Sequence, residues 1–295
     1  MSTSGIGYRG GALLVASSTF FWSTSGLFVR LIHADVMSIL FWRGVVSGLT
    51  VLIFLFAMER GRTLGILRQM GWPTVITTIW MSTSMLCGIA SLHYGTIADS
   101  MVIYATSPFV TAILAYLFIG ERPSASTVTA SLIALGGVVY MVWGTLGASG
   151  SPAGQALAVV FSISTAALAT TMRKHREVQM LPAMITSSWF CSAVTFWFMD
   201  IGTVDARDAM LLVFFGVIQS GLSLIFYTIG VKHIPAMQAS LLLALEVPLT
   251  PLWVWVFLGE TPSYPTQIGG AIVLAALFGH MLLEFRRERP TPMVT

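Results

Sequence analysis

Two ionisable side chains lie inside long apolar stretches of the sequence. Glu246 occurs in SLLLALEVPLTPLWVWVFLGE, and Arg43 occurs in ILFWRGVVSGL. A carboxylate or a guanidinium in apolar surroundings is costly unless it has a partner, so such groups often mark a binding site. We expect the two side chains to hold the charged groups of a small solute or to neutralise each other.

Each of the two residues also has a purely structural explanation. Glu246 can be a neutral acid that is hydrogen-bonded within a bundle of helices. Arg43 lies about seven residues, or roughly 10 Å, from the nearer end of its apolar stretch, so its long side chain can reach the polar boundary. The sequence leaves both explanations open.

Polar and aromatic residues recur at helical spacing along two other apolar stretches. One stripe comprises Thr77, Trp80, Ser84, Cys87 and Ser91, and the other comprises Gly216, Ser220, Ser223 and Tyr227. Hydroxyl groups and rings can contact a zwitterionic or aromatic solute, although small and hydroxyl residues also let helices pack closely. With packing as the alternative, we expect a binding surface that includes Trp22, Trp80, Thr83, Ser84, Gln219, Ser220, Ser223 and Tyr227.

Three prolines lie within apolar stretches, at Pro108, Pro248 and Pro251. Proline has no backbone N–H and weakens a helix, which permits bending and leaves carbonyl groups free to line a cavity. We expect these prolines to act in gating or helix bending.

The composition requires a lipid environment for these stretches. Of the 295 residues, 56% are hydrophobic and 9% are charged, whereas about a quarter are charged in an average soluble domain. A soluble fold would expose large apolar patches. Because the apolar runs are long and do not alternate, they favour helices over a barrel. We therefore predict an all-α integral membrane protein.

Ten stretches are long enough to cross roughly 30 Å of hydrocarbon as helices. The predicted spans are 8–31, 36–58, 71–93, 96–119, 124–145, 152–172, 180–201, 208–231, 236–258 and 264–284. With the amino terminus placed inside, twelve of the fifteen Lys and Arg residues fall on the cytoplasmic side. Because cytoplasmic loops carry the excess of positive charge, we expect both termini in the cytoplasm.

The sequence also contains an internal repeat. The stretch SMVIYATSPFVTAILAYLFIGERPS at 100–124 resembles SLLLALEVPLTPLWVWVFLGETPS at 240–263. Each copy belongs to a set of five spans, and an odd number inverts the second copy in the membrane, an arrangement typical of alternating-access transporters. We expect two inverted five-helix repeats, at 1–147 and 148–295, in which Glu121 and Glu260 fix the tight turns.

Two copies of five apolar helices, each with a Gly-Glu-x-Pro turn after a fourth span that contains serine and proline, resemble the EamA family of the drug/metabolite transporter superfamily. The resemblance covers essentially the whole chain and looks most similar to the YddG-type amino acid exporters of the bacterial inner membrane. It implies a ten-helix bundle with a central cavity between the halves, and export out of the cytoplasm.

We therefore expect a secondary transporter that exports amino acids, aromatic and other neutral ones, by alternating access. The alternative is an exporter of lipophilic cations or other small metabolites, in which Glu246 serves as the counter-charge. The short pattern Gly147-Ala-Ser-Gly150 lies in the joint between the repeats, outside any apolar run, and no P-loop is present in the sequence. We expect no enzyme activity, cofactor, metal site or nucleic-acid partner; whether the protein forms a homo-oligomer stays open.

Overall fold

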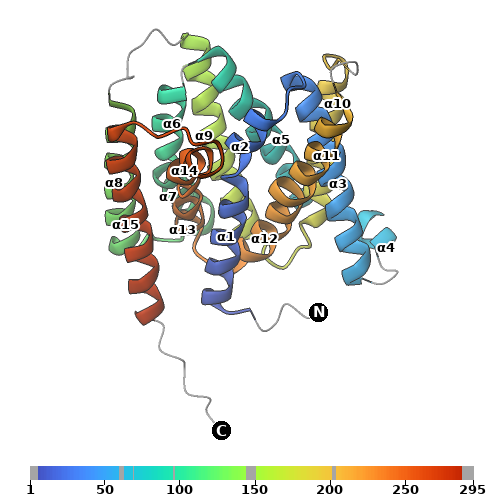
Figure 1. The fold of residues 1–295 in the computed structure, drawn as a ribbon. Helices are drawn as coiled ribbons and strands as arrows, with labels where there is room; N and C mark the ends of the chain where they lie inside the picture. The colour runs from blue at the N-terminus through green and yellow to red at the C-terminus, as the bar shows by residue number, and fades with distance from the viewer. Residues whose placement is uncertain are drawn as a thin grey trace.

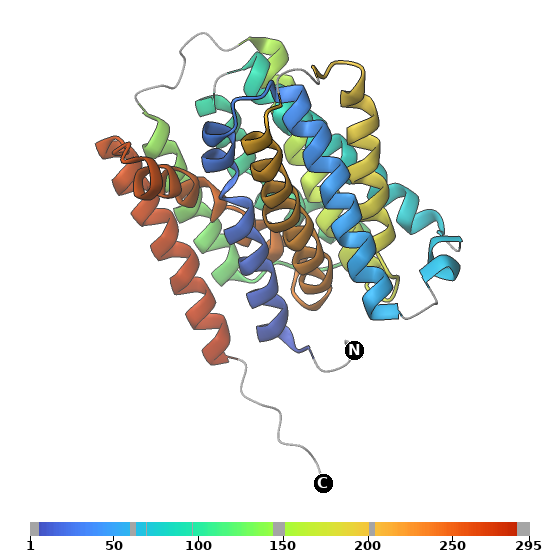
Figure 2. The same cartoon turned by 45° about the vertical axis from the view of Figure 1, so that its right-hand side comes forward.

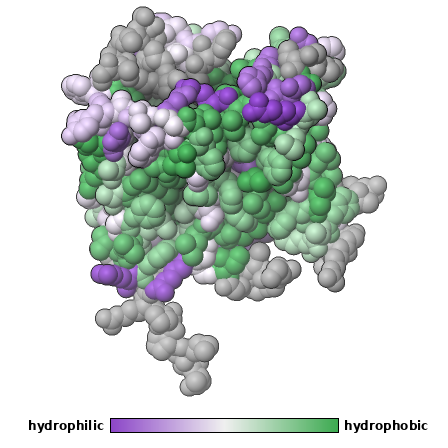
Figure 3. All heavy atoms as spheres, viewed as in Figure 1, coloured by the Kyte–Doolittle hydropathy of each residue, from purple (hydrophilic) through white to green (hydrophobic). Residues whose placement is uncertain are grey.

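The computed structural model describes residues 6–59, 63–68, 70–95, 97–143, 151–200 and 204–287. Within these ranges every regular element is a helix, and the helices form one bundle (Figures 1 and 2). On the face seen in Figure 3, a broad apolar band separates two more polar ends. The prediction of an all-helical membrane protein is confirmed.

The first half of the bundle ends with α8. Its helices are α1 (Tyr8–Trp22), α2 (Ser25–Leu31), α3 (Val36–Glu59), the short α4 (Thr63–Arg68), α5 (Trp72–Tyr94), α6 (Ile97–Ala105), α7 (Ser107–Ile119) and α8 (Ala125–Val142). The predicted boundary between the repeats, at residues 147 and 148, and the short serine pattern at 147–150 lie outside the described residues.

The second half begins with α9. Its helices are α9 (Pro152–Lys174), α10 (Leu181–Phe196), α11 (Ala206–Phe214), the π-helix η4 (Phe215–Leu222), α12 (Ser223–Gly230), the 3₁₀ turn η5 (Val231–His233), α13 (Ala236–Leu243), α14 (Glu246–Leu258) and α15 (Tyr264–Arg287). Helix α1 begins and α15 ends at the same end of the bundle (Figure 1). We call this the inner end, after the predicted orientation, and the opposite end the outer end.

Among the described residues, nine segments are long and apolar enough to cross a membrane, and α10 fills the tenth place as a shorter apolar helix. Its 16 residues reach about 24 Å. Trp197 and Phe198, directly after it, are 81% and 70% exposed, and aromatic side chains suit the membrane boundary. The chain then folds against α3, where the Ser38 hydroxyl donates to the Asp200 carbonyl at 3.0 Å. The predicted span at 180–201 is therefore too long at its end.

Many of the helix contacts recur when the two repeats are exchanged. Helix α5 packs along α9, and α12, which is equivalent to α5, packs along α1. Helix α3 packs against η4, and α10 packs against α5. Two further contacts join equivalent helices, namely α3 with α10 and α8 with α15. Helix α7 also packs against α13, whereas the corresponding contact of α14 with α6 is weaker. This pseudo-twofold pattern is the one expected of two inverted five-helix repeats.

Several spanning segments are interrupted near their middle. The first span breaks at Ser23 and Thr24, the fourth at Thr106, and the ninth at Ala244 and Leu245. The backbone N–H groups at the breaks turn to nearer carbonyls, as between Thr106 N and Ile103 O at 3.1 Å and between Ala244 N and Leu241 O at 3.0 Å. These breaks lie within the bundle, where a non-helical backbone is tolerated in a membrane.

Two of the three singled-out prolines directly follow these breaks. Pro108 lies two residues after Thr106, and Pro248 lies three residues after Leu245. Proline has no backbone N–H and cannot donate to the carbonyl four residues earlier. Pro108 and Pro248 therefore cannot form the hydrogen bonds that would make the helix continuous across each break. Pro251 lies inside α14. Their use in gating stays a prediction.

The contact between α8 and α15 provides a test of the fold. A Cβ atom added at Gly269 would lie 2.4 Å from the Gly137 carbonyl oxygen. Gly269→Ala is therefore expected to lower the free energy of unfolding by about 1 to 3 kcal/mol, because the backbones must separate. Thermal unfolding of the purified protein in detergent measures the loss. Gly279→Ala, in the same helix but with no atom within 4 Å of the added Cβ, is the control; equal losses in both variants would contradict the predicted contact.

Candidate functional site

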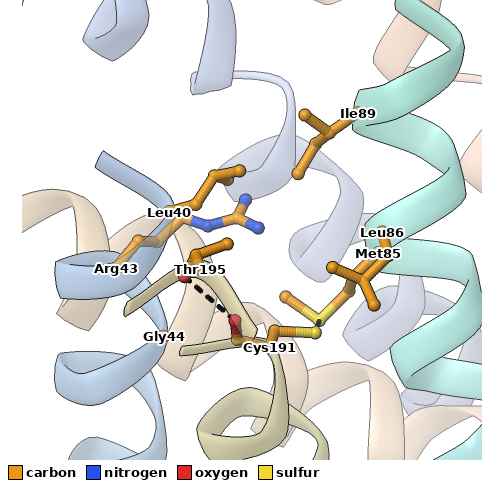
Figure 4. A pocket seen from close by; sticks show the side chains of 8 residues that line it. All are labelled: Leu40, Arg43, Gly44, Met85, Leu86, Ile89, Cys191 and Thr195. Carbon is orange, nitrogen blue, oxygen red and sulfur yellow. Dashed lines mark hydrogen bonds between the residues drawn. The ribbon is translucent and has the colours of Figure 1, made fainter. Parts of the chain in front are cut away.

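Arg43 lies in the outer half of α3, beside a hollow between α3, α5 and α10 (Figure 4). The hollow is small, with a volume of about 10 Å³, which is room for about one water molecule. Its other lining residues are Leu40, Gly44, Met85, Leu86, Ile89, Cys191 and Thr195. Apart from Arg43, the residues that line the hollow are apolar or weakly polar. The Arg43 guanidinium is therefore the charged group of this lining.

The Arg43 guanidinium has no acidic partner in direct contact among the described residues. Its Nε atom is buried without a hydrogen-bond partner. Its Cζ atom lies 5.8 Å from the centre of the Phe215 ring, which provides a cation–π contact. A buried donor without an acceptor is costly, so this side chain is suited to receive an anionic group.

Glu246 is the first residue of α14, directly after the break in the ninth span. A negative charge is favoured there by the positive end of the helix dipole. Its carboxyl group lies within electrostatic range of Arg43 and near the Tyr104 side chain. No direct ion pair joins Glu246 to Arg43 in the described part of the chain. The structure thus brings the two charges into one region and leaves both without a direct salt bridge.

Two pairs of aromatic rings contribute to the same region. The Trp22 and Tyr227 rings are 5.4 Å apart between centroids, and the Tyr104 and Phe161 rings stack at 4.7 Å. Tyr104 and Phe161 were not among the predicted site residues, because neither belongs to a polar stripe in the sequence. The position of Tyr104 two residues before the break in the fourth span becomes visible only in the structure.

The segment formed by η4 and α12 carries four predicted site residues. The Gln219 side-chain amide donates to the Trp22 carbonyl at 3.3 Å, and the Ser220 hydroxyl donates to Gln219 Oε1 at 2.5 Å. The Ser223 and Tyr227 hydroxyls are buried without a hydrogen-bond partner. A π-helix often marks a functional segment, and the two buried hydroxyls that follow it have polar atoms that the protein leaves unpaired.

The three predicted site residues on α5 differ in their surroundings. The Ser84 hydroxyl is 2.8 Å from the Thr165 hydroxyl, within the contact between α5 and α9. Trp80 is half-buried and packs against the main apolar core, and Thr83 is half-buried. Helix packing therefore accounts for the Ser84 hydroxyl without a solute. The helical periodicity of the polar residues identified the buried face of α5, but it could not show which helices or solutes that face contacts.

The orphaned Tyr227 hydroxyl gives a stability prediction. Tyr227→Phe should leave the unfolding temperature unchanged or raise it, because it removes a buried polar group that has no partner. Tyr227→Ala should lower the free energy of unfolding by about 3 to 5 kcal/mol, as for other large aromatic truncations, because the ring is fully buried against Trp22. Thermal unfolding of both variants in one detergent compares them. Equal destabilisation by the two would show that the hydroxyl has a partner after all.

Known proteins resemble this chain over most of its length. The EamA-like transporter family matches residues 9–143 and, separately, residues 152–282. The pseudopaline exporter CntI of Pseudomonas aeruginosa strain UCBPP-PA14 is 22% identical, over 91% of this chain and 94% of its own. An uncharacterized transporter of Archaeoglobus fulgidus is 24% identical, over 91% of this chain and 95% of its own. A solved crystal structure covers 95% of this chain and 99% of its own with a TM-score of 0.78 and 19% identity, which shows a shared fold.

Proposed function

Because the chain belongs to the EamA-like transporter family, we propose that it exports amino acids, aromatic and other neutral ones, from the cytoplasm by alternating access. The observation that carries the substrate class is the pair of opposite charges in the bundle. Arg43 lacks a direct acidic partner, and Glu246 lies within electrostatic range of it. We assign the solute carboxylate to Arg43 and the solute ammonium to Glu246.

The aromatic rings support the preference for aromatic and other neutral solutes. Tyr104, which lies near Glu246, stacks on Phe161, and Trp22 contacts Tyr227. Rings of this kind offer an apolar surface with polar tips. In this proposal the solute side chain lies against them, while the orphaned hydroxyls of Ser223 and Tyr227 contact its polar atoms.

The second candidate solute class is lipophilic cations. Glu246 beside aromatic rings favours such a solute, but the buried guanidinium of Arg43 repels it. A zwitterion uses both charges, so the amino acid is the better match. One relative is an exporter of pseudopaline, which supports the outward direction that we propose for this chain.

We further propose that the protein lies in the bacterial inner membrane with both termini in the cytoplasm. The charge asymmetry of the sequence supports this orientation, and α1 begins at the same end of the bundle as α15 ends. The units that alternate are the repeats at 1–147 and 148–295. A fluorescent-protein fusion at the carboxyl terminus should therefore be bright, and an alkaline phosphatase fusion there should be inactive.

The charge assignments predict distinct effects of two substitutions on uptake of radiolabelled L-phenylalanine into liposomes that contain the purified protein. Arg43→Gln should raise the half-saturating concentration about 10- to 100-fold, because a hydrogen bond to a charged group is typically worth about 1.5 to 3 kcal/mol. Glu246→Gln should impair uptake similarly.

Arg207→Gln is the matched control, because Arg207 is an exposed arginine in α11 near the outer end. It should leave uptake unchanged. Unaltered uptake in both Arg43→Gln and Glu246→Gln would refute the assignments. Saturable uptake of a quaternary ammonium compound without any amino acid flux would favour the lipophilic cation instead.

A further inference from the structure

Each Gly-Glu-x-Pro turn of the chain binds an arginine from the other repeat. At the inner end, Arg173 Nε lies 3.2 Å from Glu121 Oε2. At the outer end, Arg30 Nη1 lies 2.6 Å from Glu260 Oε1. We call these the inner pair and the outer pair. The sequence suggested only that the two glutamates fix their turns, because each arginine is distant from its partner along the chain.

The two ion pairs are equivalent under the pseudo-twofold relation. Arg30 lies in the last turn of the first span, and Arg173 lies in the last turn of the sixth, which is the first span of the second repeat. The glutamates follow Gly120 and Gly259, whose φ angles of 75° and 72° close the same left-handed turn. Each pair therefore joins the first span of one repeat to the turn after the fourth span of the other.

The surroundings of the two pairs differ. The side chains of the inner pair are 20% and 21% exposed, whereas those of the outer pair are 58% and 50% exposed. Solvent screens an exposed pair and leaves it weak, while partial burial strengthens the attraction. The inner pair is thus the stronger contact in this conformation.

Additional hydrogen bonds brace the inner pair. Glu121 Oε1 accepts from the backbone N–H of Ala236 at 2.9 Å, and Arg173 Nη1 donates to the Lys232 carbonyl at 2.6 Å. These contacts tie the fourth, sixth, eighth and ninth spans together at the inner end. In the described part of the chain, the side chains of Arg30 and Glu260 bond only each other.

We propose that the two ion pairs are reciprocal latches that set which end of the transporter opens. When inverted repeats exchange conformations, one access state becomes the other. The outer pair must then acquire the buried, braced surroundings that the inner pair has here, while the inner pair loosens. In this structure the inner latch is the tighter one, and the hollow beside Arg43 occupies the outer half. The proposal does not depend on which solute is carried.

The native thiol of Cys191 gives a direct test, because it lines that hollow and is only 6% exposed, so its rate of modification reports how often the outer half opens. In a Cys87→Ser background, the rate of Cys191 modification by a small, membrane-impermeant sulfonated thiosulfonate is measured from the outside of intact cells. Glu121→Gln retains an oxygen that can accept from Ala236 but loses the charge that attracts Arg173. It should slow modification about tenfold, which corresponds to a shift of about 1.4 kcal/mol toward the inward-open state.

Glu260→Gln is the matched variant at the other latch and should leave the rate within about twofold of the parent or raise it, since each latch biases the equilibrium in the opposite direction. Exchange of the inner charges, with Glu121→Arg and Arg173→Glu together, should restore the rate in part, because the ion pair returns while the hydrogen bonds to the Ala236 N–H and the Lys232 carbonyl are lost. If Glu121→Gln fails to fold, Arg173→Gln removes the same ion pair and should slow modification equally. An unchanged rate in the inner variants, or equal slowing by Glu260→Gln, would overturn the proposal.

Discussion

Inside a bilayer, every peptide group that leaves a helix must find its hydrogen-bond partner within the protein. The breaks in the first, fourth and ninth spans satisfy this constraint by turning inward and using tighter backbone bonds. Because such breaks can exist only where other helices surround them, they gather in the middle of the bundle. That is also where Glu246 begins α14 and Trp22 ends α1. The position of the candidate site thus follows from the requirement that the backbone stay bonded.

The buried charges of Arg43 and Glu246 are a second constraint, and the internal repeat does not account for it. At the position equivalent to Glu246, the first repeat has Thr106, so the carboxylate breaks the internal symmetry. Arg43 and Glu246 lie within electrostatic range, yet neither has a direct salt bridge among the described residues. Two nearby opposite charges without direct contact match the two charged ends of a zwitterion, which is the basis for the proposed substrate class.

Much of the fold could be predicted from the sequence, because a helix that crosses the bilayer must be apolar over about 20 residues and such stretches are easily recognised. The spans, their all-helical character and the inverted repeat follow from these stretches and from the repeated Gly-Glu-x-Pro turns. The candidate site was harder to predict from the sequence. Periodicity marked the buried face of α5 but could not show that Ser84 meets Thr165. The stacking of Tyr104 on Phe161 and the binding of Arg173 to Glu121 depend on how distant helices pack, which no single span reveals.

Binding of three related ligands to the purified wild-type protein, measured by calorimetry, tests the two-charge site most directly. L-Phenylalanine carries both charges, hydrocinnamate carries only the carboxylate, and phenethylamine carries only the ammonium. Two charge-assisted contacts predict that L-phenylalanine binds at least about tenfold more tightly than either analogue. If phenethylamine binds as tightly as L-phenylalanine, Arg43 does not hold a carboxylate, and the zwitterion account is wrong.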